Sequence, residues 1–223
     1  MMRHAPERGR SPVRAVWRLG IPVATQSLLS SMLAFVDTTM VTSLGASALA
    51  GVGIAGRMLF VVSMVLSGLA GGTGILVAQY AGAGRTEEIR GKVAAALCLG
   101  VLLTMPLAVA SLFFGSRLGA MLAPDADVAA AAATFLTYGA AYAPATAISM
   151  MLAATLRSLG NTRTPLWSGA SSLALNTLLN YVFVLGHFGA PSYGIAAAAL
   201  ATTAARLIEI SSLAFALRRH LAI

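Results

Sequence analysis

The chain has 223 residues, of which 58% are apolar and only 10% are charged, and its formal net charge is +8. A soluble domain carries about 25% charged residues, and a chain this poor in them cannot cover its core with a polar shell. The composition therefore predicts an integral membrane protein and excludes a disordered chain, a collagen or a coiled coil.

Six long apolar segments follow one another with short connections between them. Each is long enough for a membrane-crossing helix, which needs about 20 mostly apolar residues, and none shows the alternation of barrel strands. We therefore predict an all-α fold with one domain over residues 1–223, a single lobe of six transmembrane helices. The segments are residues 19–44, 58–84, 93–116, 128–156, 164–186 and 193–217.

The basic residues lie at the ends of these segments, where membrane proteins carry them, so we expect no nucleic-acid partner. Lys and Arg resist translocation, and nearly all of them fall on one side of the predicted topology. We expect both termini, including a tail over residues 1–14, to be cytoplasmic. The residues that set this orientation are Arg3, Arg8, Arg10, Arg14, Arg18, Arg85, Arg90, Lys92, Arg157, Arg163, Arg218 and Arg219.

Two further features of the apolar segments carry structural expectations. The spacing of Gly68 and Gly72 predicts close approach of two helix backbones in the second segment. The single cysteine, Cys98, excludes a disulfide framework and a thiolate metal cluster, and we expect it to be a small core residue.

Asp37 is the outstanding polar residue of the first segment. An ionisable side chain in hydrocarbon costs about 2.5–3.5 kcal/mol on insertion scales, so it marks a functional site by default. Gln26, Ser30 and Asp37 fall within about 40° of one another on an ideal helix. Pro22, one turn before Gln26, weakens the backbone hydrogen bonding there. The alternative is an aspartate that caps the outer helix end and faces water.

The fifth segment carries Ser168, Ser172, Asn176 and Asn180 at intervals of four, which places them in one ribbon on the helix. The ribbon serves either a site or helix–helix packing, because amides in a membrane need partners. Asp37, Asn176, Asn180 and Thr202 lie at similar depth, about 9–15 Å from the outer helix ends. Together they could hold a proton or a small cation.

Three charged residues within or directly beside the segments need a separate interpretation. Arg206 and Glu209 stand three residues apart in the sixth segment and can neutralise each other along one helix face; the alternative is a second gating site. Arg57 either marks the outer interface or contacts Asp37.

The sequence contains no motif for catalysis. It has no nucleophile triad, no glycine-rich phosphate loop with its lysine and no histidine pair at metal spacing. We therefore expect no enzyme, no cofactor and no ATP hydrolysis, so that any transport must be driven by a gradient.

Several segments resemble the multidrug and toxic compound extrusion (MATE) transporters. The run from Phe35 to Val41 with Leu44-Gly45 looks like the first-helix signature of that family. The runs 77–84, 156–165, 176–181 and 194–202 are similar to its second helix end, its loop between helices four and five, its fifth helix and its sixth helix.

The resemblance implies a cation-driven antiporter in the cell (inner) membrane that exports small organic, often cationic, compounds. It implies that Asp37 binds the coupling proton or sodium ion, with Asn176, Asn180 and Thr202 around it, and no other metal. Some members carry aspartate where this chain has Asn180, which leaves Asp37 as the only carboxylate of the cluster. Candidates for lining the cleft or gating it are Pro22, Gln26, Ser30 and Tyr138.

The family has two six-helix lobes with the substrate cleft between them, and this chain resembles only the first. We expect its partners to be the lipid bilayer, organic cations and either a second copy of the chain or a separate second lobe. The alternatives are a flippase for lipid-linked intermediates, a non-transporting truncated fragment and a facilitator without ion coupling.

Overall fold

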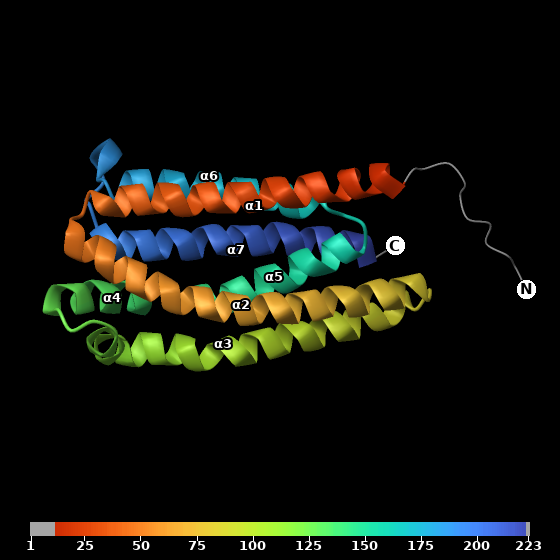
Figure 1. The fold of residues 1–223 in the computed structure, drawn as a ribbon, viewed down its shortest axis with the longest axis horizontal. Helices are drawn as coiled ribbons and strands as arrows, with labels where there is room; N and C mark the ends of the chain where they lie inside the picture. The colour runs from red at the N-terminus through yellow and green to blue at the C-terminus, as the bar shows by residue number, and fades with distance from the viewer. Residues whose placement is uncertain (1–11, 222–223) are drawn as a thin grey trace, which may run out of the picture.

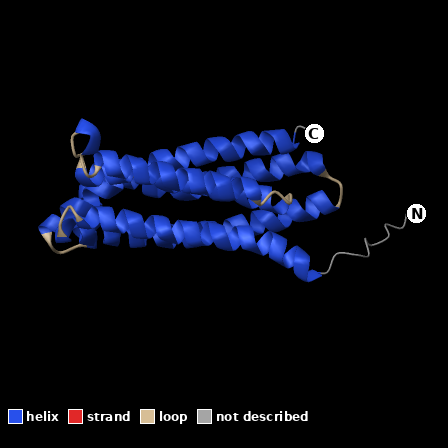
Figure 2. Cartoon of the chain, turned by 90° about the horizontal axis from the view of Figure 1, so that it is seen from above, coloured by secondary structure: helices blue, strands red, loops and turns tan. Residues whose placement is uncertain are grey.

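The computed structural model describes residues 12–221, and this part of the chain is helical with no strand (Figures 1 and 2). Its elements are α1 (Pro12–Thr42), α2 (Ala46–Gly82), α3 (Thr86–Leu122), α4 (Ala126–Tyr138), α5 (Tyr142–Ser158), α6 (Arg163–Phe183), a short 3₁₀ turn η1 (His187–Gly189) and α7 (Gly194–Leu221). The prediction of an all-α fold is confirmed.

The helices lie side by side along one long axis, with α1 and α6 on one side, α7 in the middle, and α2 and α3 on the other side (Figure 1). The α2–α3 and α5–α6 loops, the start of α1 and the end of α7 share one end of the bundle. We call it the basic end, because it carries Arg85, Arg163, Arg218 and Arg219. The side of the membrane that this end faces stays a prediction.

Within the described residues, α2, α3 and α7 are each long and apolar enough to cross a membrane, and α4 with α5 passes the same test as a bent pair. The helix α6 is not among them, because its polar ribbon lowers its hydropathy although the ribbon is buried in the bundle. The protein is thus a multi-pass membrane protein, and the number of six spans remains a prediction.

The fourth predicted segment, 128–156, is wrong as one continuous helix. It is divided into α4 and α5, which meet at an angle of 52° across Gly139, Ala140 and Ala141. Pro144 lies in the first turn of α5. It has no N–H to donate, so an unbroken helix would lose the bond to the carbonyl four residues earlier. The break therefore has a local cause in the sequence.

The close helix contacts occur at other glycines than expected. Gly68 and Gly72 are exposed, and a Cβ atom at either would meet nothing within 4 Å, so the predicted approach there is wrong within this lobe. At Gly51 of α2 a Cβ would lie 2.5 Å from the Ala131 Cβ and 2.7 Å from the Val128 oxygen of α4. The backbones of α2 and α4 therefore touch where only glycine fits.

The structure also places two further residues, Cys98 and Arg57. Cys98 is exposed on α3 and is not a core residue. Arg57 is exposed and lies inside the length of α2 rather than before it. The helix begins at Ala46, twelve residues before the predicted segment. The helix thus continues past the arginine, whose long side chain can reach the interface from an exposed face.

Candidate functional site

Three of the predicted site residues are joined by hydrogen bonds, one within α6 and one between α6 and α7. The Asn180 Nδ2 group donates to Asn176 Oδ1 at 3.2 Å, and the Asn176 Nδ2 group donates to Thr202 Oγ1 at 3.1 Å. Thr202 Oγ1 donates in turn to the Ala198 carbonyl at 2.8 Å. Asn176 and Asn180 are 0% and 1% exposed. We call these three side chains the amide network.

The amide network exists because the ribbon predicted on the fifth segment faces α7. Ser168, Ser172, Asn176 and Asn180 are all buried, and α6 packs along α7. Ser172 Oγ donates to the Ala205 carbonyl of α7 at 3.0 Å, and Ser168 Oγ is hydrogen-bonded to Ser212 Oγ. Ser168, Ser172 and Asn176 thus each have a partner on α7, and Asn180 bonds Asn176 of its own helix, so the ribbon is satisfied as polar groups in a membrane require.

Asp37 belongs to a turn of α1 that lies against the same pair of helices. The structure describes the α1 backbone at Asp37, while its side chain lies outside the described residues. Val41, one turn further on, is buried against Val184, Ala197 and Ala198. Because Ala198 is the acceptor for Thr202, this contact places the Asp37 turn of α1 beside the part of α7 that carries the amide network.

A cavity of about 420 Å³ opens in this half of the bundle. Its lining includes four hydroxyl-bearing residues, Thr38, Ser63, Tyr142 and Thr202, and the other lining residues are apolar. Thr202 therefore belongs to both the amide network and the cavity. The remaining lining residues are Val41, Leu49, Val52, Gly53, Gly56, Leu59, Phe60, Phe135, Gly139, Ala198 and Ala199.

The other predicted cleft or gating residues have different places. Pro22, Gln26 and Ser30 lie in α1, and their side chains are outside the described residues. Tyr138 is the exposed last residue of α4, whereas the cavity wall is formed by Gly139 and Tyr142. Sequence reasoning missed Tyr142; the available signal was an aromatic residue between Gly139 and Pro144, at a point where a helix must break.

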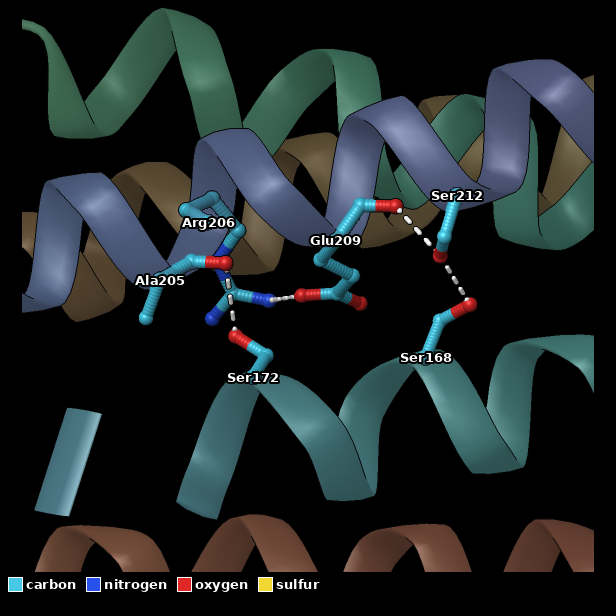
Figure 3. Close-up of polar contacts among 6 residues, drawn as sticks. All are labelled: Ser168, Ser172, Ala205, Arg206, Glu209 and Ser212. Carbon is cyan, nitrogen blue, oxygen red and sulfur yellow. Dashed lines mark hydrogen bonds and ion pairs between the residues drawn. The ribbon is translucent and has the colours of Figure 1, made fainter. Parts of the chain in front are cut away.

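Arg206 and Glu209 form the predicted pair. Arg206 Nη1 lies 2.7 Å from Glu209 Oε2, and the glutamate side chain is 5% exposed. Figure 3 shows the pair between α7 and α6, with Ser172 beside one end and Ser168 and Ser212 beside the other. The pair neutralises two charges that would be costly in the membrane.

The amide network provides a stability prediction with a matched control. Thr202→Val removes the hydroxyl that accepts from Asn176, and we expect an unfolding free energy lower by about 0.6 kcal/mol and at most about 1.7 kcal/mol. Thr203 is also buried, and its hydroxyl bonds the Ala199 carbonyl of its own helix. Thr203→Val should therefore cost less. Denaturant titration of both variants in detergent checks this order, and an equal loss would contradict it.

The fold and the buried site define a class: one helical lobe of a multi-helix membrane protein with a polar network beside an internal cavity. A family model described as MatE matches residues 22–182. The chain therefore belongs to the MATE family.

Relatives and solved structures agree with this assignment. A probable multidrug resistance protein NorM of Thermotoga maritima is 26% identical over 204 residues, which are 89% of this chain and 43% of the relative. Another, from Bradyrhizobium diazoefficiens, is 30% identical over 191 residues, 85% of this chain and 41% of the relative. A structure described as the outward-facing conformation of a multidrug resistance MATE family transporter has a TM-score of 0.82 and 21% identity, covering 93% of this chain and 45% of that one.

The matches cover most of this chain but only part of each matched protein. The chain spans less than half the length of the curated relatives that it matches. The solved structure shares its fold with this chain over one lobe only.

Proposed function

We propose that the chain is the cation-binding lobe of a secondary active exporter of small organic compounds. The observation that carries the proposal is the double role of Thr202, which ends the amide network and also lines the cavity. Binding or loss of an ion at the amide network can thereby alter the cavity wall against which a compound binds.

In the proposed mechanism Asp37 holds the coupling ion. Its turn of α1 packs against Ala198 through Val41, and Thr38, the next residue after Asp37, lines the cavity. Neutral amide and hydroxyl oxygens around one carboxylate suit either a proton on the acid or a sodium ion. Ion binding changes the charge at this turn and favours release of the compound, and compound binding in turn favours loss of the ion.

We further propose that two copies of the chain pair to supply the second lobe. The chain covers only 41–43% of the relatives' length, and one lobe alone cannot enclose a cleft that opens alternately to both sides. Two lobes in the same orientation, related by an axis along the membrane normal, would reproduce the arrangement of parallel repeats. Chemical crosslinking in native membranes should give a dimer; only monomer would contradict the pairing.

The function is tested by flux measurements on the purified chain in proteoliposomes, with ethidium as the probe. We expect an imposed proton or sodium gradient to drive ethidium across the membrane in the direction opposite to the ion flow. This ethidium transport should stop when the gradient is collapsed. Flux that is independent of both gradients would instead indicate a facilitator. Movement of a fluorescent lipid-linked sugar without ethidium movement would indicate a flippase. If neither compound moves, the proposal for this chain is overturned.

A further inference from the structure

Tyr142 connects the cavity to the charged pair of α7. It is the first residue of α5, directly after the break, and it lines the cavity together with Phe60 and Phe135. The Arg206 guanidinium carbon lies 5.8 Å from the centre of the Tyr142 ring, within the range of a cation–π contact. The tyrosine is therefore held from α7, although it belongs to α5.

Arg206 is itself fixed by Glu209. The side chains of the pair are 22% and 5% exposed, so the acid is enclosed in the bundle (Figure 3). The groups that face this acid from its own helix and from α5 are Arg206 and Arg157. The adjoining face of α6 contributes the uncharged Ser168 and Ser172.

A buried ion pair is poor evidence of a gain in stability, since well-packed apolar residues often do as well. It is better explained here by what the arginine touches. The guanidinium contacts the Tyr142 ring at a cation–π distance, while its Nη1 group is bonded to Glu209. The sequence of contacts from Glu209 to Arg206 to Tyr142 can thus fix the plane of the tyrosine ring.

We propose that the Arg206–Glu209 pair is a positioning unit that holds Tyr142 as a stacking surface for planar aromatic compounds in the cavity. The ligand class rests on the proposed export function, whereas the positioning does not. Offset stacking on an aromatic ring needs a fixed ring plane. Tyr142 is the first residue of α5, so no earlier turn of its own helix flanks the ring, and Arg206 of α7 contacts it instead.

The positioning is tested without any ligand by ¹⁹F NMR of the full chain labelled with fluorotyrosine. The chain has five tyrosines, and Tyr142→Phe identifies the resonance of position 142. Arg206→Met alone would leave a buried, unpaired acid, so the test variant is R206M/E209M, which removes both charges. We expect its Tyr142 resonance to shift and broaden. An unchanged resonance in a folded double variant would overturn the proposal.

A second ion pair provides the matched control. Arg85 and Glu88 are also three residues apart, with an N–O distance of 2.5 Å, but they lie exposed at the α2–α3 loop. Their hydrogen bond and charge attraction raise the pKa of Arg85. Glu88→Gln should leave the Tyr142 resonance unchanged, and a shift as large as that of R206M/E209M would show a nonspecific effect of charge.

The ligand class is tested by ethidium binding to the same proteins. We expect R206M/E209M to bind about threefold to tenfold more weakly, the cost of immobilising one side chain. In a Tyr142→Ala background the same double change should cause no further loss. Equal losses in both backgrounds would overturn the link through Tyr142. Absence of ethidium binding by the unaltered chain would reject the ligand class, while the NMR result would still decide the positioning.

Discussion

Asp37→Asn is expected to reduce ion-driven export by this protein severely. The amide keeps the size of the side chain and removes its ability to carry a charge that changes with ion binding. Without that difference between the two states, the gradient has no means of shifting the equilibrium. We expect gradient-driven ethidium flux in proteoliposomes to fall by about tenfold to a hundredfold, the usual range of a coupling free energy.

The fold should survive this change, since a neutral amide is cheaper in a membrane than a carboxylate. Thermal unfolding in detergent provides the control, and the melting temperature should remain close to that of the unaltered chain. Flux by Asp37→Asn with the same dependence on pH and sodium as the unaltered chain would contradict the mechanism.

Gly51→Val is expected to have the largest effect on folding. A Cβ at this position would lie 2.5 Å from Ala131 Cβ and 2.8 Å from the Ala132 nitrogen of α4. The helices must therefore separate to accept it, and overpacking of this kind costs about 1–3 kcal/mol, occasionally more. Because α4 also forms part of the cavity wall through Phe135, we expect weaker ethidium binding as well.

Gly72 on the same helix provides the control for this substitution. It is exposed, and a Cβ there meets nothing within 4 Å. Gly72→Val in the purified single lobe should leave the melting temperature nearly unchanged, and Gly51→Val should lower it. Equal melting temperatures for the two variants would show that α2 and α4 are not in close contact at Gly51.

The pattern of polar residues predicted the face of α6 correctly. An interval of four places Ser168, Ser172, Asn176 and Asn180 on one side of a helix whatever surrounds it, and burial of amides requires a partner. The sequence could not show that the partner helix is α7. That depends on the packing of the whole bundle, which places Thr202 and Ala205 opposite the ribbon.

Local sequence patterns mislead where the same pattern allows two different structures. Small residues such as Gly68 and Gly72 permit close packing without specifying a neighbour, and within this lobe they face outward while Gly51 makes the contact. Similarly, uniform hydropathy from 128 to 156 concealed the break before Pro144. That break is what places Tyr142, rather than Tyr138, in the cavity wall.

The central claim is that the Asp37 carboxyl group is the ion-binding acid beside the amide network, and infrared difference spectroscopy tests it most directly. A pH titration of the purified chain should show a protonated carboxyl band that is missing in Asp37→Asn and shifted in Thr202→Val, but unshifted in Thr203→Val. A band that persists in Asp37→Asn, or one that ignores the loss of the Thr202 hydroxyl, would contradict the account.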